Sequence, residues 1–316
     1  MKRYKPVSLK KVKRYSLKGR KSKVEISRIG SIYDKGRTFS NFLGTIPRIL
    51  AGSDIVHVAD AIIKAREKKK PVVLAMGAHP IKVGLSPIII DLIRNGIITA
   101  IAANGAAIIH DFELSYVGMT SEDVAEELSK GTFGMAKETG GLINKAINSG
   151  VKKGHGIGYA IGECIGKKKD FTYKESSIFY NAYANGIPAT VHVAVGTDII
   201  HMHPEADGAA IGEGSMRDFK LLTSVVSDLE GGVFINLGSA VIMPEVFLKA
   251  LTVARNLGNK VNNITTVSMD FIKQYRTIEN VLKRPTLKGG KSYNLIGHHE
   301  INVPLLAAII KEGTKG

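Results

Sequence analysis

The sequence predicts an α/β protein with a doubly wound, mostly parallel sheet that is covered by helices on both faces. Short apolar runs rich in β-branched residues alternate with longer amphipathic stretches, and Gly, Pro or Asn bounds each apolar run. Alternation of this kind favours parallel pairing, because the connecting helices then cover both sides of the strands.

Each predicted element follows from its own pattern. The predicted strands are residues 71–76, 97–104, 188–195, 232–238 and 261–269. The predicted helices are residues 53–69, 86–96, 120–131, 132–150, 175–186, 215–231, 244–258 and 302–313. Several helices begin at a capping residue or an early proline, such as Ser53, Thr120 and Pro244, and several end at glycine, such as Gly96 and Gly131.

The composition is that of a folded globular protein. The chain has 316 residues, of which 44% are hydrophobic and 23% charged, and this excludes a disordered chain or a fibre. The single cysteine, Cys164, excludes an internal disulfide and a four-thiolate zinc site. No apolar run approaches the ~20 residues that a membrane-spanning helix needs. We therefore expect a soluble, cytoplasmic protein that does not contact membranes.

The positive charge is concentrated at the amino terminus. The net charge is +16, and residues 1–30 contain 12 Lys or Arg and one acid, which gives this segment +11. We expect a basic arm over residues 1–30 and one domain over residues 31–316. The arm could be a solvated tail, pack on a neighbouring subunit, or bind RNA or an acidic protein face. No recognised nucleic-acid motif follows it, so a nucleic-acid partner is not the favoured interpretation.

The predicted strands end in segments of similar chemistry. Residues 77–84, 104–111, 196–204, 238–244 and 265–270 are rich in Gly, small residues, His or Asp. Ligands of doubly wound sheets bind beyond the carboxyl ends of the strands. Glycine at such an end lets the backbone approach a phosphate, so these segments together favour nucleotide binding. No GxGxxG follows a predicted strand, and the glycine-containing run 154–163 follows a predicted helix and is interpreted as a loop.

Three aspartates, Asp111, Asp198 and Asp270, lie at different strand ends. A carboxylate there can accept hydrogen bonds from ribose hydroxyls or can cap a helix. Function is slightly favoured for Asp198 and Asp270, and for Asp111 the two interpretations are equal.

Histidines are clustered in two places. His201 and His203 form an HxH pair, which on an extended segment would place both rings on one side, as a metal site requires. A third ligand could come from His298, His299 or Glu300. An acid/base or substrate-contact role is the favoured interpretation, and a purely structural role is the other alternative to a metal site. Metal-assisted hydrolysis or lyase chemistry stays open as an alternative function.

Four segments resemble the deoxyhypusine synthase family. They are 105-GAAIIHDFELSYVG-118, residues 176–202 with Thr-Asp at 197–198, residues 215–250, and 264-ITTVSMD-270, and the resemblance covers roughly residues 70–310. That family consists of NAD-dependent transferases with a single Rossmann-like domain. They move an aminobutyl group from spermidine to one lysine of a translation factor, which begins hypusine formation, through an imine on an active-site lysine.

The resemblance implies NAD bound at a subunit interface of a homotetramer. The implied cofactor contacts are His79, Asn104, Gly105, His110, Asp198, Gly238, Ser239, Thr265, Thr266 and Asp270. The family's paired glutamates near the second strand end are replaced here by Ile109 and His110.

The resemblance also implies candidate catalytic positions, at which this chain departs from the family. His203 stands where the family has a polyamine-binding aspartate, Glu245 lies where it has a lysine and two histidines, and Lys283 is the lysine nearest its imine-forming position. We therefore expect an NAD-dependent transferase or oxidoreductase that acts on a polyamine or another amine in a divergent pocket.

Overall fold

The computed structural model describes residues 3–314 and divides the chain into two compact units, Met1–Gly52 and Ser53–Gly316. Within the first unit, the structure places the short 3-10 turns η1 (Leu9–Lys11), η2 (Leu17–Gly19) and η3 (Ile26–Arg28) and helix α1 (Phe39–Thr45). Thr38 and Asn41 cap each other at the start of α1. No residue between 3 and 52 is fully buried, so this unit contributes no hydrophobic core.

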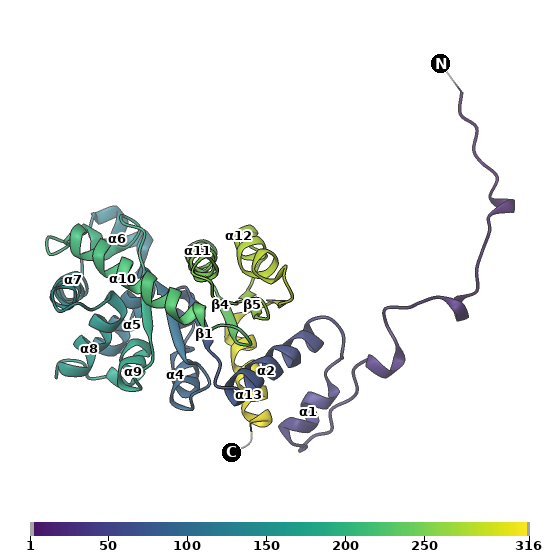
Figure 1. Cartoon of the computed structure of the whole chain (residues 1–316), viewed down its shortest axis with the longest axis horizontal. Helices are drawn as coiled ribbons and strands as arrows, with labels where there is room; N and C mark the ends of the chain where they lie inside the picture. Colours follow the sequence, from purple (N-terminus) through teal and green to yellow (C-terminus); the bar gives the residue numbers. More distant parts are fainter. Residues whose placement is uncertain (1–2, 315–316) are drawn as a thin grey trace. The chain divides into compact units, whose positions relative to one another are not determined.

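The second unit contains a six-stranded parallel sheet (Figure 1). The strands are β1 (Val72–Met76), β2 (Ala100–Asn104), β3 (Ala189–His192), β4 (Val233–Leu237), β5 (Thr265–Asp270) and β6 (Lys291–Ile296). Their order is β3-β2-β1-β4-β5-β6, and every neighbouring pair is parallel. All five predicted strands are present, and the predicted α/β class with a doubly wound parallel sheet is confirmed.

Helices surround the sheet in the second unit (Figure 1). The longer helices are α2 (Ala51–Glu67), α4 (Ser86–Arg94), α5 (Gly105–Val117), α7 (Lys137–Lys152), α8 (Ile157–Lys167), α10 (Gly208–Ser227), α11 (Ile242–Asn256) and α13 (His299–Gly313). The shorter ones are α3 (His79–Lys82), α6 (Val124–Lys130), α9 (Ile178–Ala184), α12 (Tyr275–Thr277), η4 (Lys174–Ser176), η5 (Ile199–Met202), η6 (Ile278–Lys283) and η7 (Arg284–Thr286).

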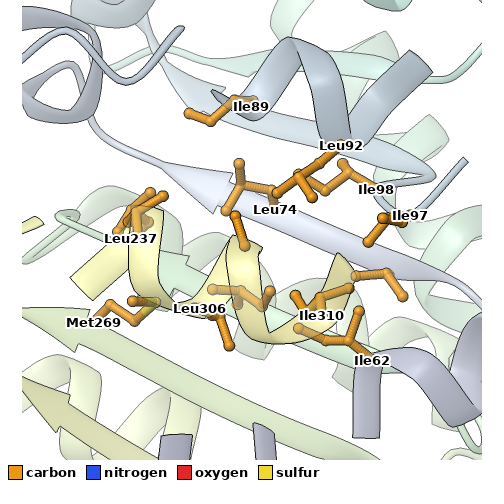
Figure 2. A pocket seen from close by; sticks show the side chains of 14 residues that line it. Ile62, Leu74, Ile89, Leu92, Ile97, Ile98, Leu237, Met269, Leu306 and Ile310 are labelled. Atoms are coloured by element: carbon orange, nitrogen blue, oxygen red, sulfur yellow. The ribbon is translucent and has the colours of Figure 1, made fainter. Parts of the chain in front are cut away.

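Alternate residues of the buried strands pack on opposite faces, because side chains alternate along a strand. On one face, Val73 and Phe234 join a core formed with α10, α11 and η6, where Phe234 stacks on Phe247 with ring centroids 3.7 Å apart. On the other face, Leu74 packs toward Leu306 of α13, together with side chains of α2 and α4 (Figure 2). A small apolar cavity of about 30 Å³ remains there, with room for about one water molecule.

Three elements differ from the sequence prediction. The segment after β2 forms helix α5, and strand β6 was not predicted. The glycine-containing run 154–163 is a loop only as far as Gly156, because helix α8 begins at Ile157. That helix is fixed by Asp218, whose Oδ2 atom accepts hydrogen bonds from the backbone N–H of Gly158 at 3.0 Å and of Val191 at 2.8 Å. Among residues 3–314, no helix is both long and apolar enough to cross a membrane.

Candidate functional site

The carboxyl ends of all six strands lie at one edge of the sheet because the strands are parallel. The chain order reverses between β1 and β4, since β2 and β3 lie on one side of this pair and β5 and β6 on the other. At this point Gly77 donates its backbone N–H to the carbonyl of Leu237 at 3.1 Å. A Cβ at Gly77 would lie 2.5 Å from the carbonyl oxygen of Gly238, so only glycine allows the two backbones to approach this closely.

Asp198 and Gly105 form the first group of predicted residues, at the end of β2. The side chain of Asn104 caps α5 by accepting the N–H of Ala107 at 3.1 Å, and Gly105 is the first residue of that helix. The space beside Gly105 is filled by Asp198, because a Cβ at position 105 would lie 2.0 Å from Asp198 Oδ2. Burial raises the pKa of the Asp198 carboxyl, and His201 and Thr197 partly offset this. The fold thus holds the Asp198 carboxylate against the first residue of helix α5.

A cavity of about 470 Å³ opens beside Asp198. Its polar side chains come from α3, α5 and the segments that precede α6 and η5; they are Lys82, His110, Glu113, Thr120, Ser121, Glu122, Thr197 and Asp198. Apolar side chains, including Ile109 and Phe133, complete the lining. A mostly pre-formed cavity with a few convergent polar groups at the carboxyl edge of the sheet is typical of a ligand site.

His110 is fixed by a chain of hydrogen bonds inside this cavity. Its Nδ1 lies 2.7 Å from Thr120 Oγ1, and the Thr120 hydroxyl donates to Glu113 Oε2 at 2.6 Å. The other oxygen of Glu113 accepts the hydroxyl of Thr139 at 3.0 Å. Burial lowers the pKa of His110, Glu113 opposes this shift, and Lys82 adds to it. Burial therefore disfavours the charged form of the imidazole, and the contact with Thr120 holds the ring in one orientation.

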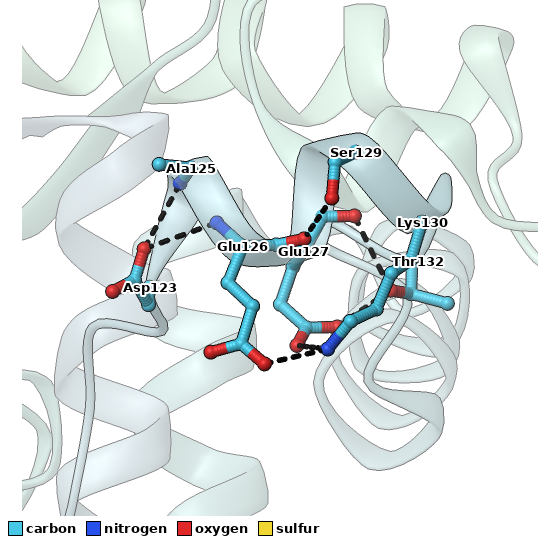
Figure 3. A network of polar contacts seen from close by, with 7 residues as sticks. All are labelled: Asp123, Ala125, Glu126, Glu127, Ser129, Lys130 and Thr132. Atoms are coloured by element: carbon cyan, nitrogen blue, oxygen red, sulfur yellow. Dashed lines mark hydrogen bonds and ion pairs between the residues drawn. The ribbon is translucent and has the colours of Figure 1, made fainter.

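Helix α6 lies beside the same cavity, which Val124 and Glu122 help to line. The side chain of Asp123 caps it by accepting the N–H groups of Ala125 and Glu126, and Lys130 pairs with Glu126 and Glu127 (Figure 3). No residue of α6 is buried. Its shape is therefore maintained by local polar contacts and capping rather than by packing.

A second group of predicted residues lies at the ends of β4, β5 and β6. The His79 ring lies 5.4 Å from the His299 ring and 6.2 Å from that of Phe271, between centroids. His299 also packs against Gly238, where a Cβ would lie 2.7 Å from its Cε1. Ser239 Oγ accepts the N–H of Met243 at 3.2 Å, and Asp270 is buried beside His299. Helix α3 links the two groups, because His79 begins it and Lys82 at its end lines the cavity.

Thr265 and Thr266 lie away from both groups. They begin β5 at the amino edge of the sheet, and Asp270 is the residue at its carboxyl end. Thr266 is fully buried, and Thr265 lines a separate cavity of about 330 Å³ together with Lys64, Lys291 and other residues.

The three predicted catalytic residues lie on separate elements and make local contacts. The His203 ring packs on the backbone of Gly140, and its Nε2 lies 2.8 Å from the carbonyl oxygen of Gly134. Glu245 is paired with Lys249 and Arg276 and accepts the amide of Asn280, and the Lys249 contact is the main cause of its lowered pKa. Lys283 is exposed and pairs with Glu279 at 2.7 Å.

The possible metal site is not assembled. His201 Nδ1 accepts the backbone N–H of Gly196 and Asp198, at 3.1 and 3.2 Å. The third ligand suggested by the sequence was to come from His298, His299 or Glu300. These residues follow β6, and His201 follows β3. Because β3 and β6 are the outermost strands on opposite sides of the sheet, none of the three can join His201. Within residues 3–314, no three His, Cys, Asp or Glu side chains are grouped so that they could hold a metal ion.

Asp111 caps a helix from a distance. Its carboxylate accepts the hydroxyl of Ser177 at 2.5 Å and the N–H of Ile178 at 2.7 Å, at the start of α9. Burial raises its pKa to about 6. Of the two interpretations left open for Asp111, the structure supports helix capping.

Sequence reasoning missed Lys82, Glu113, Thr120 and Glu122 as cavity residues. These residues were missed because helix α5 was not predicted. In a helix, His110 and Glu113 lie about one turn apart on the same face. Asn104 was the available signal, since asparagine before an apolar stretch favours a helix start.

Comparisons with known proteins connect the chain with a fold. No protein-family model matches it, and no curated protein matches it. Among solved structures it is similar to a protein from Entamoeba histolytica that is provisionally assigned as a deoxyhypusine synthase, with 16% identity and a TM-score of 0.54, over 90% of this chain and 97% of that one. It is also similar to a conserved protein from Methanococcus maripaludis S2, provisionally assigned to LOR/SDH, with 17% identity and a TM-score of 0.51, over 93% and 75%.

A third similar structure is AgrE, solved as a ternary complex with ornithine and NAD+, with 17% identity and a TM-score of 0.50. The match covers 82% of this chain and 33% of AgrE, and the chain likewise spans 31% of ArgZ, an arginine dihydrolase from cyanobacteria. The chain thus spans about a third of the length of these two proteins. At these identities the likeness shows a shared fold, and a fold by itself does not specify an activity.

Proposed function

We propose that this chain binds NAD at the carboxyl edge of its sheet and uses it in a redox or transfer reaction on a small amine. The strand order β3-β2-β1-β4-β5-β6 carries the proposal, together with the cavity beside Asp198. In doubly wound sheets of this order, dinucleotides bind where the order reverses.

The residues at this edge fit such a cofactor. Asp198 is a carboxylate held beside the first residue of α5, where it can accept hydrogen bonds from ribose hydroxyls. Because Gly105 has no side chain, the Asp198 carboxylate can lie against the start of α5. Gly77 and Gly238 let two backbone segments meet at the point of reversal.

Amine substrates are supported by the cavity's charge and by the neighbouring complex. Glu113, Glu122 and Asp198 are three acids in the cavity, and Lys82 is its one basic residue besides His110 among the described lining residues. AgrE, which shares the fold, was solved with ornithine and NAD+. A homotetramer and a cytoplasmic location, both expected from the resemblance and composition, belong to the same proposal.

The direct test is whether NAD stabilises the protein. A ligand that binds only the native state at 100 times its dissociation constant adds about 2.7 kcal/mol to the free energy of unfolding. In a domain of this size we expect the thermal midpoint to rise by several degrees. ATP serves as a control nucleotide without a nicotinamide. No shift at millimolar NAD+ or NADH would refute the proposal.

A further inference from the structure

The hydrogen bonds around His110 determine which of its ring nitrogens carries the proton. The Thr120 hydroxyl has one hydrogen, which it donates to Glu113 Oε2 at 2.6 Å. Thr120 Oγ1 must therefore accept the hydrogen of His110 Nδ1 at 2.7 Å. The neutral ring then has its lone pair on Nε2. The tautomer follows from donor and acceptor balance.

Glu113, at the far end of this series of hydrogen bonds, is itself held in place. Glu113 Oε1 accepts the Thr139 hydroxyl at 3.0 Å, and Thr139 is buried on α7. Glu113 is thus fixed from a second helix and cannot turn away from Thr120. Its charge favours the protonated ring, as shown by its opposition to the effect of burial on the pKa of His110. An imidazole oriented through its Nδ1 toward a carboxylate is the arrangement that general bases use.

We propose that His110 Nε2 is the proton acceptor for the reaction in this cavity, and that Thr120 and Glu113 are its positioning residues. This inference rests on the proposed function. The substrate amine loses its N–H proton to Nε2 as the adjacent carbon gives a hydride to bound NAD+. A C=N bond forms, the amine is oxidised, the cofactor is reduced, and His110 becomes an imidazolium. Thr120 and Glu113 stabilise that cation without taking its proton.

The other charged groups of the cavity also affect the pKa of His110. Lys82 on α3 disfavours the imidazolium, whereas Glu113 on α5 favours it. Glu122 and Asp198, from the segments before α6 and η5, also line the cavity. Burial is the main cause of the lowered pKa, so the ring loses its proton at a lower pH than an exposed histidine would.

The first experiment measures the tautomer without turnover. NMR of protein labelled with ¹⁵N-histidine, with His110 assigned through the His110→Gln variant, should show a protonated Nδ1 and a bare Nε2 at pH 8. Glu113→Gln should lower the pKa of His110, because it removes the opposing negative charge. Thr120→Val should abolish the preference for Nδ1–H, and Thr120→Ser, which keeps the hydroxyl, should restore it. A protonated Nε2 in the wild type would refute the proposal.

The second experiment separates this role from cofactor binding. With NAD+ and putrescine, spermidine or L-ornithine as substrates, His110→Gln should lower kcat by about 10²–10⁴-fold, the usual contribution of a general base. Thr120→Val should lower kcat and Thr120→Ser should recover most of it, with little change in KM. The thermal shift produced by NAD+ should be the same in all of these variants.

Each outcome of the second experiment is decisive. If His110→Gln removes the NAD+ shift, His110 is a cofactor contact and the inference fails while NAD binding stands. If the wild type binds NAD+ but reduces it with none of these amines, the proton-acceptor role is also wrong. If NAD+ does not shift the wild type, the proposed function and the inference fail together.

Discussion

Replacing Gly105 with alanine tests the proposed cofactor site by a single methyl group. A Cβ at this position would lie 2.0 Å from Asp198 Oδ2 and 2.8 Å from its Cγ. Real Cβ atoms do not approach other heavy atoms within 3.0 Å, so the carboxylate must retreat by at least about 1 Å. A shift of that size at a reacting or binding group can cost about 100-fold.

The expected magnitude follows from the contact that is lost. A hydrogen bond to a charged acceptor contributes about 1.5–3 kcal/mol, so we expect Gly105→Ala to weaken NAD binding by roughly 10–100-fold. Asp198→Asn, which removes the charge but keeps the volume, should weaken binding over a similar range. The effect on folding should be small, because alanine is favoured over glycine in a helix by up to about 1 kcal/mol, which offsets part of the strain at Gly105.

Gly212→Ala is the matched control. Gly212 also lies in a helix, α10, and a Cβ there would meet nothing within 4 Å. We expect this variant to be about 0.5–1 kcal/mol more stable than the wild type, with unchanged NAD affinity. Calorimetric titration with NAD+ and thermal unfolding measure both quantities. If Gly105→Ala binds NAD+ within twofold of the wild type, Asp198 is not a ribose contact and the reasoning is wrong.

Two further predictions concern stability. Burial raises the pKa of Asp218 to about 7, so the folded protein keeps a proton there that the unfolded chain loses above its ordinary value near 4. This group therefore makes the free energy of unfolding fall as pH rises from about 4 to 7. Urea unfolding at several pH values should show that Asp218→Asn removes up to about 4 kcal/mol of this pH dependence. If the free energy of unfolding depends on pH equally in the variant and the wild type, the raised pKa of Asp218 is wrong. Phe247→Ala, on one face of the sheet, should lower the free energy of unfolding by about 3–5 kcal/mol, and Leu306→Ala, on the other face, by about 2–5 kcal/mol. Denaturant unfolding measures both values. A loss below about 1 kcal/mol for either variant would mean that its face is not packed as described.

The sequence was most informative about the buried strands. Runs such as residues 71–76 are apolar on both faces, as central parallel strands must be. This pattern can be recognised from the local sequence alone. Strand β6 escaped prediction because it lies at the edge, where Lys291, Ser292 and Ile296 are exposed and the apolar run is broken. Helix α5 escaped because it is apolar around most of its circumference and so lacks a clear period.

The candidate site was predictable only where it depended on strand ends. Asp198, Gly105 and His110 come together because β2 and β3 are parallel neighbours. Thr265 and Thr266 were placed at a strand tip, but β5 begins at Thr265 and its tip is Asp270. The HxH spacing of His201 and His203 indicates one-sided rings only in an extended segment, and residues 199–202 form a 3-10 turn instead. Such conformations depend on packing that lies outside the local sequence.

The close passage of Gly77 over Gly238 has a consequence for how this scaffold tolerates change. Where two main chains touch in this way, neither position has room for a side chain, so the junction between β1 and β4 depends on peptide groups alone. This junction can persist while the side chains around it are exchanged, as long as both positions remain glycine. Substitution elsewhere would then change the residues near the carboxyl ends of the strands without moving β1 and β4 apart.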